Sequence, residues 1–287
     1  HHREEHPARC DAVRRRCETR GPIGQRNRLK GVHLQHQIES VPAIVIRKSE
    51  EIPDLVADRR IRVLPSAPFD RRLRHVERGH LETQRGLLDG VLCVSNALVD
   101  LVSDCLPDLA KANRVQLISY PIDGLAAMPE RPPLAKRTVV IGWVGRMQTE
   151  QKRVERLPAL FKAFESAGID FRFELLGDGP RQPWLEKHLP RGRTIFHGRK
   201  SGNDYASVLS GWDFITNVSD YEGLPISMLE AFSAGVLPLC PAIGCGGDEY
   251  SAKLGDEFVW NAFDFDQAAT KLKFILDKPE PMLAQAR

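Results

Sequence analysis

Short apolar runs alternate with segments of helical apolar period through the second half of the chain. Six runs have the length of a strand: VVIGWV (139–144), FRFELL (171–176), TIF (194–196), FITNV (214–218), VLPLC (236–240) and EFVW (257–260). Between the first two runs, large apolar side chains recur at i, i+3, i+4 and i+7, at Leu157, Leu160, Phe161 and Phe164. Strands that alternate with amphipathic helices are typical of βαβ units. This half is therefore predicted to form a parallel sheet with helices on both faces.

Residues 31–123 show the same alternation less completely. Their strand candidates are AIVI (43–46), RVL (62–64), GVLCVS (90–95) and RVQLIS (114–119), with helices expected over 70–88 and 96–104. The following stretch, 124–136, is rich in proline and lacks apolar periodicity, which marks a linker. We therefore predict an α/β protein with two Rossmann-like domains, each with a parallel sheet, a partial one over 31–123 and a complete one over 137–287. A basic, poorly ordered arm is expected at 1–30.

Composition and charge narrow the class of protein. The 287 residues are 42% hydrophobic and 28% charged, as in globular proteins. Residues 1–30 carry nine Arg or Lys and four Asp or Glu, so the rest of the chain is slightly acidic and nucleic-acid binding is excluded. No apolar run approaches the roughly 20 residues of a membrane helix, and the start does not resemble a signal peptide. The six cysteines include no C-x-x-C pair, which favours a reducing cytoplasm.

The stretch SDYEGLPISMLEAFSAG (219–235) is the most informative in the chain. It leaves a strand, crosses a short loop and enters a helix, with Pro225 suited to the first helical position and Gly235 to the exit. The backbone N–H groups of Gly223, Leu224 and Ile226 are then expected to face the carboxyl end of the strand. Together with the positive end of the helix dipole, they predict a phosphate site.

Two glutamates flank this helix entry. Glu222 precedes the helix and Glu230 lies about one and a half turns inside it. One carboxylate can therefore reach a sugar near the phosphate and the other a ribose diol. Each glutamate taken alone is also compatible with a solvated charge at a helix end. The glycine-proline entry between them favours the functional interpretation.

A second candidate cluster follows the first strand of this domain, in GWVGRMQTEQKR (142–153). Gly142 and Gly145 let the backbone approach a ligand closely. Arg146, Lys152 and Arg153 can gather at the same strand end, and a diphosphate suits them because Arg forks onto two phosphate oxygens while Lys supplies a compact charge. A solvated basic loop is the alternative. Residues 142–153 have no carboxylate cluster near them that would indicate a bound metal.

The glycines of LLGDGP (175–180) do not indicate a nucleotide fingerprint. Their spacing differs from G-x-G-x-x-G, and no Walker lysine follows. We therefore expect a tight strand-to-helix turn here, and neither a dinucleotide nor an ATP site.

With these motifs the sequence resembles the retaining glycosyltransferases of family 4, which have two Rossmann-like domains in the GT-B arrangement. The stretches that carry the resemblance, over residues 89–280, are VGRMQTEQKR, ELLGDGP, TIFHGR, EGLPISMLE and AFSAGVLPLCPAIGCGGDE. The resemblance implies that Arg146 and Lys152 bind the donor diphosphate, Glu230 the ribose hydroxyls and Glu222 the transferred sugar. It also implies that the backbone from His197 to Lys200 lies beside the base. The family's first strands have no counterpart before residue 31, which implies a truncated acceptor domain.

The resemblance implies transfer of a sugar from a nucleotide sugar to a glycan, lipid-linked or other hydroxyl acceptor, with retention of configuration and without a metal or cofactor. The expected catalytic residues are Glu222, Arg146 and Lys152. The expected donor contacts are Gly145, Arg153, Arg199, Gly223, Leu224 and Glu230. The expected location is the cytoplasm, either free or in peripheral contact with the inner face of the membrane. Two alternatives stay open: a donor-binding module without turnover, and another GT-B sugar-nucleotide enzyme such as a 2-epimerase.

Overall fold

The computed structural model describes residues 43–47, 61–63, 88–122, 134 and 137–278, all of them within the unit Val41–Arg287. The predicted arm at 1–30 lies outside these residues. So does the helix predicted over 70–88, except for Leu88, which is the first residue of a strand. The predicted linker also lies outside them apart from Leu134, which is buried in the core of the second domain.

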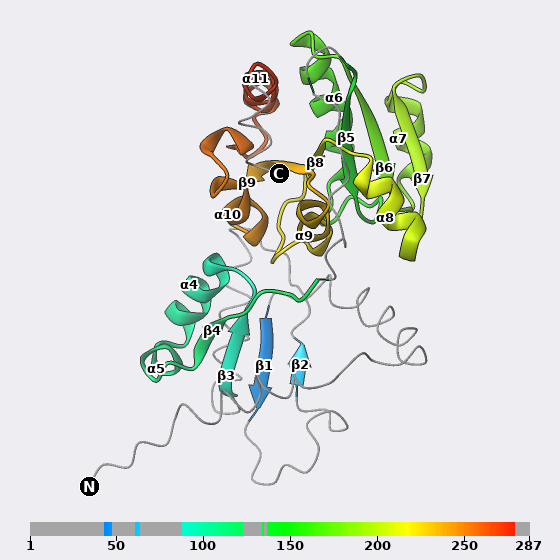
Figure 1. The fold of residues 1–287 in the computed structure, drawn as a ribbon. Coiled ribbons are helices and arrows are strands. Elements are labelled where there is room, and N and C mark those ends of the chain that lie inside the picture. The colour runs from blue at the N-terminus through cyan, green and yellow to red at the C-terminus, as the bar shows by residue number, and fades with distance from the viewer. Residues whose placement is uncertain (1–42, 48–60, 64–87, 123–133, 135–136, 279–287) are drawn as a thin grey trace, which may run out of the picture. The chain divides into compact units, whose positions relative to one another are not determined.

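Residues 137–278 contain a six-stranded sheet in which every pair of neighbouring strands is parallel. Its strands are β5 (Val139–Val144), β6 (Phe171–Leu176), β7 (Thr194–Gly198), β8 (Phe214–Thr216), β9 (Leu237–Ala242) and β10 (Val259–Asn261). The order across the sheet is β10-β9-β8-β5-β6-β7, and the strands from β5 to β9 are labelled in Figure 1. The predicted parallel sheet is confirmed here, and β5 and β6 match their predicted bounds.

The helices of this domain follow the strands as βαβ units require. They are η2 (Val154–Arg156), α6 (Leu157–Ser166), α7 (Gln182–His188), α8 (Gly202–Ser210), α9 (Ile226–Ser233), α10 (Gly246–Ala252), η3 (Asp256–Phe258) and α11 (Phe265–Leu276). The four side chains of the predicted helical stripe are all buried in α6. Because EFVW begins in η3, only its last two residues belong to a strand.

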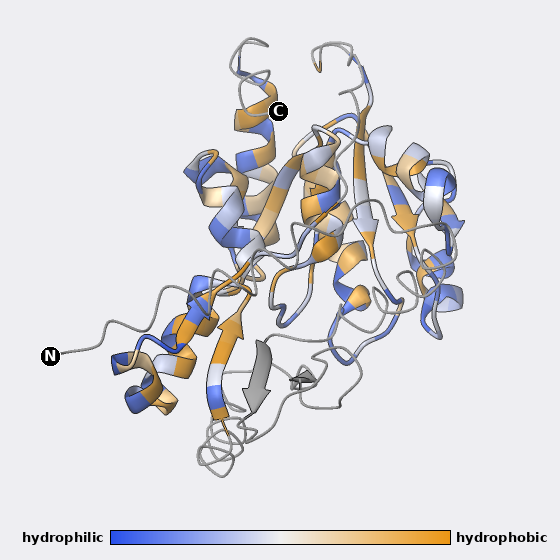
Figure 2. Cartoon of the chain, turned by 60° about the horizontal axis from the view of Figure 1, so that its bottom comes forward, coloured by the Kyte–Doolittle hydropathy of each residue, from blue (hydrophilic) through white to orange (hydrophobic). Residues whose placement is uncertain are grey.

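Successive residues of each strand point to opposite faces of the sheet and enter two separate cores. Ile141 and Trp143 on β5 pack with residues of α6 and α11, whereas Val140 packs with residues of α8 and α9. In Figure 2 the strands are mostly in the hydrophobic colour, while the helices carry both colours. The sheet is therefore buried on both sides, which explains why its strands read as continuous apolar runs.

The described part of the first domain contains a four-stranded sheet of order β2-β1-β3-β4. Its elements are β1 (Ala43–Arg47), β2 (Ile61–Val63), β3 (Leu88–Cys93), α4 (Asn96–Cys105), α5 (Pro107–Lys111) and β4 (Val115–Leu117). The pair β3 and β4 is parallel, as predicted, but β1 runs antiparallel to both β2 and β3. The expectation of a fully parallel sheet is corrected at β1. An apolar run predicts a strand without its direction, which the connections decide.

Candidate functional site

The loops that follow β5 and β8 meet at one edge of the six-stranded sheet. The two strands are parallel neighbours, so their carboxyl ends lie together. The backbone N–H of Asp220 donates to the carbonyl of Gln151 at 3.0 Å, and the Gln151 side chain donates to the carbonyl of Tyr221 at 3.3 Å. The structure thus brings together the two segments that the sequence marked as candidate sites.

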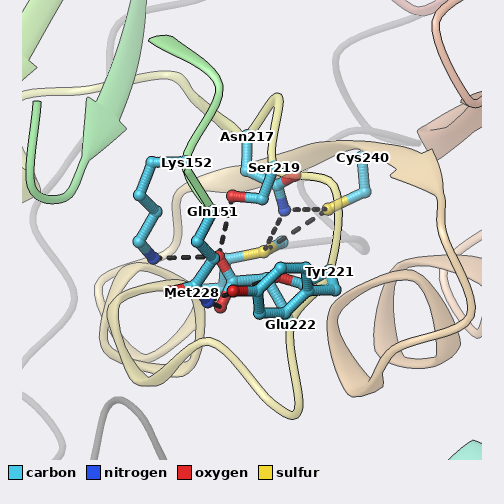
Figure 3. Close-up of polar contacts among 8 residues, drawn as sticks. All are labelled: Gln151, Lys152, Asn217, Ser219, Tyr221, Glu222, Met228 and Cys240. Carbon is cyan, nitrogen blue, oxygen red and sulfur yellow. Dashed lines mark hydrogen bonds and ion pairs between the residues drawn. The ribbon is translucent and has the colours of Figure 1, made fainter. Parts of the chain in front are cut away.

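Glu222 lies at the centre of this junction (Figure 3). One of its carboxylate oxygens is 2.8 Å from the ammonium nitrogen of Lys152. The same oxygen accepts a hydrogen bond from the Ser219 hydroxyl, with 2.7 Å between the two oxygens. The other accepts from the Gln151 side chain at 3.3 Å. The Glu222 and Lys152 side chains are only 4% and 12% exposed. The pair is therefore shielded from water, and its geometry is fixed by several hydrogen bonds instead of by one flexible contact.

Arg153 lies in the same loop but is held by carboxylates. Its guanidinium forms an ion pair with Asp220 and a longer one, at 3.6 Å, with Glu155. The hydrogen bond to Asp220 raises the pKa of Arg153 further above its ordinary value. Arg156 also pairs with Asp220, at 2.7 Å, and donates to the carbonyl of Val218 at 3.0 Å. These contacts join the loop after β5 to the loop after β8.

Arg146 lies on the outer side of this junction. Its side chain is exposed and forms no ion pair with any residue that the structure describes. Gly145, directly before it, lies against the stem of Lys152: a Cβ at position 145 would be 3.3 Å from the Lys152 Cε and 3.1 Å from the Trp143 ring. A side chain at position 145 would therefore press on the lysine that reaches Glu222.

The turn after β6 packs directly against the backbone of the loop after β5. Gly177 has φ +129°, and a Cβ there would lie 2.0 Å from the carbonyl oxygen of Gly145. Gly179 has φ +152°, and a Cβ there would lie 2.6 Å from the carbonyl oxygen of Met147. The expectation of a tight strand-to-helix turn at LLGDGP is confirmed. Both glycines are needed because two backbones approach there more closely than any side chain allows.

The entry of α9 presents backbone donors beside Glu222. The helix begins at Ile226, so Pro225 is its N-cap instead of its first residue, and Gly235 ends it with φ +70°. Within the described part of the chain, the N–H groups of Gly223, Leu224 and Ile226 donate to no acceptor. Free N–H groups at a helix start favour an anion.

Glu230 lies inside α9 and has a partner on another helix. The hydroxyl of Tyr205, on α8, donates to its Oε2 at 2.6 Å. Arg199 is exposed and follows the last residue of β7. The neighbouring His197 forms a 2.8 Å contact with Glu174, which also accepts the indole N–H of Trp212.

Next to the junction, the buried side chains of Asn217, Met228 and Cys240 contact one another (Figure 3). The side-chain amide of Asn217 approaches the sulfurs of Met228, at 3.7 Å, and Cys240, at 4.0 Å. Burial raises the pKa of the Cys240 thiol, and likewise that of Cys245. Since a thiolate is the reactive form, these cysteines belong to the packing and not to the chemistry of the site.

Sequence reasoning singled out Glu222, Lys152 and Glu230 as candidates, but it missed the residues that contact the two glutamates. Ser219 stands three positions before Glu222, and this spacing was the one available signal. Gln151 had no signal, because its role depends on where the loop after β8 lies. Tyr205 had none either. Within the described ranges no group of three or more His, Cys, Asp or Glu could hold a metal ion. Over the same ranges no helix combines the length and apolarity needed to span a membrane.

The six-stranded parallel sheet with helices on both faces is a Rossmann-like α/β fold, and it is similar to the fold of GT-B glycosyltransferases of known structure. Residues 138–278 match the model of the family described as Glycosyl transferases group 1.

Three known proteins illustrate the similarity. The 2-deoxystreptamine glucosyltransferase of Streptomyces kanamyceticus is 27% identical over 202 residues, which cover 69% of this chain and 51% of that enzyme. The chain thus spans about half the length of this relative. A TarM mutant of S. aureus, crystallised with fondaparinux, alpha-GlcNAc-glycerol and UDP, has a TM-score of 0.59 at 15% identity, covering 85% of this chain and 44% of that one. HepE of Anabaena in complex with UDP-glucose has a TM-score of 0.58 at 14% identity, covering 74% and 61%. At these identities the two structures establish the fold alone.

Proposed function

We propose that residues 137–287 bind the nucleotide-sugar donor of a retaining glycosyltransferase, which moves the sugar to an acceptor hydroxyl. The observation that carries the proposal is the shielded Lys152–Glu222 pair, 2.8 Å apart, beside the N–H groups that begin α9. A cation, a carboxylate and helix-start amides at one point suit a ligand with a phosphate next to a hydroxylated ring. The match of residues 138–278 to the Glycosyl transferases group 1 model supports the same ligand class.

Arg146 and Lys152 are the proposed diphosphate contacts, with the N–H groups of Gly223 and Leu224. They would offset the negative charge that develops on the departing diphosphate, a contribution of roughly 3 kcal/mol for each fixed donor. With this charge stabilisation the proposed reaction needs no metal. Gly145 leaves the space in which the Lys152 stem lies.

The two glutamates have different proposed ligands. Glu222 would accept hydrogen bonds from hydroxyl groups of the transferred sugar, since it lies beside Lys152. Glu230 would accept hydrogen bonds from the ribose hydroxyl groups. The backbone at Arg199 would lie beside the base. We assign Arg153 to the framework of the loop, because its ion pairs with Asp220 and Glu155 connect the two segments.

Two similar structures are complexes with UDP or UDP-glucose, so UDP sugars are the first donors to test. The acceptor would be a hydroxyl of a glycan, a lipid-linked sugar or another small molecule. The proposed location is the cytoplasm or the inner face of the membrane.

The decisive experiment is calorimetry with UDP, ADP and GDP and their glucose derivatives, followed by product analysis with a panel of acceptors. The proposal predicts binding of at least one nucleoside diphosphate, loss of that binding in Arg146→Ala and Lys152→Ala, and an α-linked product from an α-linked donor. Added chelator should leave binding unchanged. Failure to bind any nucleotide would contradict the proposal. Donor isomerisation without transfer would indicate an epimerase instead.

A further inference from the structure

Tyr205 is attached to the proposed ribose carboxylate by a short hydrogen bond. Its hydroxyl oxygen lies 2.6 Å from Oε2 of Glu230, although the two residues are 25 positions apart and belong to α8 and α9. A separation of about 2.5 to 2.7 Å is typical of a hydroxyl that donates to a carboxylate, and such bonds are roughly twice as strong as neutral ones.

The tyrosine ring is fixed by packing. It lies against the buried cluster on the face of the sheet that α8 and α9 cover, which includes Trp212, Met228 and Ala231. A tyrosine has only two side-chain torsions, so a ring held in such a cluster places its hydroxyl in one position. The hydrogen bond therefore links the orientation of Glu230 to a ring that packs against this cluster.

The helix that carries Tyr205 leaves the strand end proposed for the base. α8 begins at Gly202, four residues after Gly198 ends β7, with Arg199 between them (Figure 1). Glu230 belongs to α9, the next helix along the chain. Tyr205 thus connects the segment proposed for the base with the carboxylate proposed for the ribose.

We propose that Tyr205 is a positioning residue for ribose recognition, through Glu230. This inference rests on the proposed function, in which Glu230 accepts the ribose hydroxyls. A carboxylate has about four acceptor positions, and Tyr205 occupies one of them. The orientation that it imposes presents the carboxylate to a diol before the nucleotide arrives, which lowers the entropy lost on binding.

The test is Tyr205→Phe, which keeps the ring and removes the hydroxyl. Calorimetry is done with UDP and with 2′-deoxy-UDP, which lacks one ribose hydroxyl. We expect UDP to bind about five- to tenfold more weakly, within the range that the loss of one net intramolecular hydrogen bond predicts, with a smaller change for 2′-deoxy-UDP. The preference for UDP over 2′-deoxy-UDP therefore falls. Tyr250→Phe, on α10, is the matched control and should leave both affinities unchanged.

A second comparison identifies the route of the effect. In a Glu230→Gln background, Tyr205→Phe should cause no further loss of ribose preference, because the hydroxyl acts through the carboxylate. Equal weakening of both nucleotides, an undiminished effect in that background, or wild-type affinity in Tyr205→Phe would each overturn the inference. So would loss of the fold in Tyr205→Phe, which would make the hydroxyl structural. Those outcomes leave the proposed function intact, whereas a wild-type chain that binds no nucleotide contradicts both.

Discussion

The ammonium nitrogen of Lys152 lies 2.8 Å from Oε1 of Glu222, although the two residues stand 70 positions apart in the sequence. The lysine belongs to the loop after β5 and the glutamate to the loop before α9. The same carboxylate also accepts from Ser219 and Gln151. A ligand phosphate that binds Lys152 would therefore compete with Glu222 for the lysine ammonium or share it. Binding at the loop after β5 is in this way coupled to the loop before α9.

Lys152→Ala should affect both stability and binding. Removal of one member of a shielded ion pair leaves Glu222 uncompensated, so we expect the free energy of unfolding to fall by about 3 kcal/mol. The dissociation constant for a nucleoside diphosphate should rise about tenfold or more, as the loss of a charged hydrogen bond predicts. Urea denaturation and calorimetry measure the two effects. Lys162→Ala, an exposed lysine on α6, is the control and should change neither.

The double variant Lys152→Met with Glu222→Gln separates these effects. Both charges are then absent, so no carboxylate is left unpaired and most of the lost stability should return. Nucleotide binding should not return. Recovery of binding together with stability would show that Lys152 acts on the fold alone and makes no contact with a phosphate.

The two glutamates should differ in the part of the donor that each variant disturbs. Glu230→Gln is expected to weaken a nucleoside diphosphate and its sugar derivative alike, because both contain the ribose. Glu222→Gln should mainly remove the additional affinity or turnover that the sugar supplies. Calorimetry with UDP and UDP-glucose on each variant measures the difference. The division of roles is wrong if both variants weaken free UDP equally and spare the contribution of the sugar.

Gly177→Ala should strongly destabilise the chain. Its Cβ would lie 2.0 Å from the carbonyl oxygen of Gly145, and its φ of +129° is unsuited to a side chain. Overpacking and backbone strain together predict a loss of about 3 to 5 kcal/mol. Gly168→Ala is the matched control: φ there is +73°, but nothing lies within 4 Å of the added Cβ, so only the backbone strain of about 1 kcal/mol remains. Similar midpoints in urea for the two variants would refute the steric argument.

Three cysteines should resist alkylation in the folded chain. Burial raises the pKa of Cys93 to about 12 and also raises the pKa values of Cys240 and Cys245. At pH 8 the thiolate fraction of Cys93 is then on the order of 10⁻⁴, against roughly a quarter for an ordinary cysteine. Iodoacetamide labelling, read residue by residue by mass spectrometry, should therefore be slow before unfolding and rapid in denaturant. Rapid labelling of Cys240 in the folded chain would contradict its burial.

The sequence alone determined the alternation of strands and helices from residue 137 onward. Each strand there is buried on both faces, so a continuous apolar run such as VVIGWV is a strong local signal with little to confuse it. The stripe of α6 was equally clear, because a helix that covers a sheet has one apolar face. Short elements were harder: the end of β8 and the η3 turn depend on neighbours that a local pattern does not contain. For the same reason the antiparallel direction of β1 could not be read from its apolar residues.

The sequence also singled out Lys152, Glu222 and Glu230, since rare combinations of charge, glycine and proline mark a strand end. Only the tertiary structure decided their partners. The Lys152–Glu222 pair depends on β5 and β8 being neighbours, and the bond from Tyr205 to Glu230 depends on α8 and α9 covering one face of the sheet. A sequence pattern records which residues share an element. Which side chains meet between elements follows from the packing of the whole sheet, in which contacts between residues far apart in the chain are formed together.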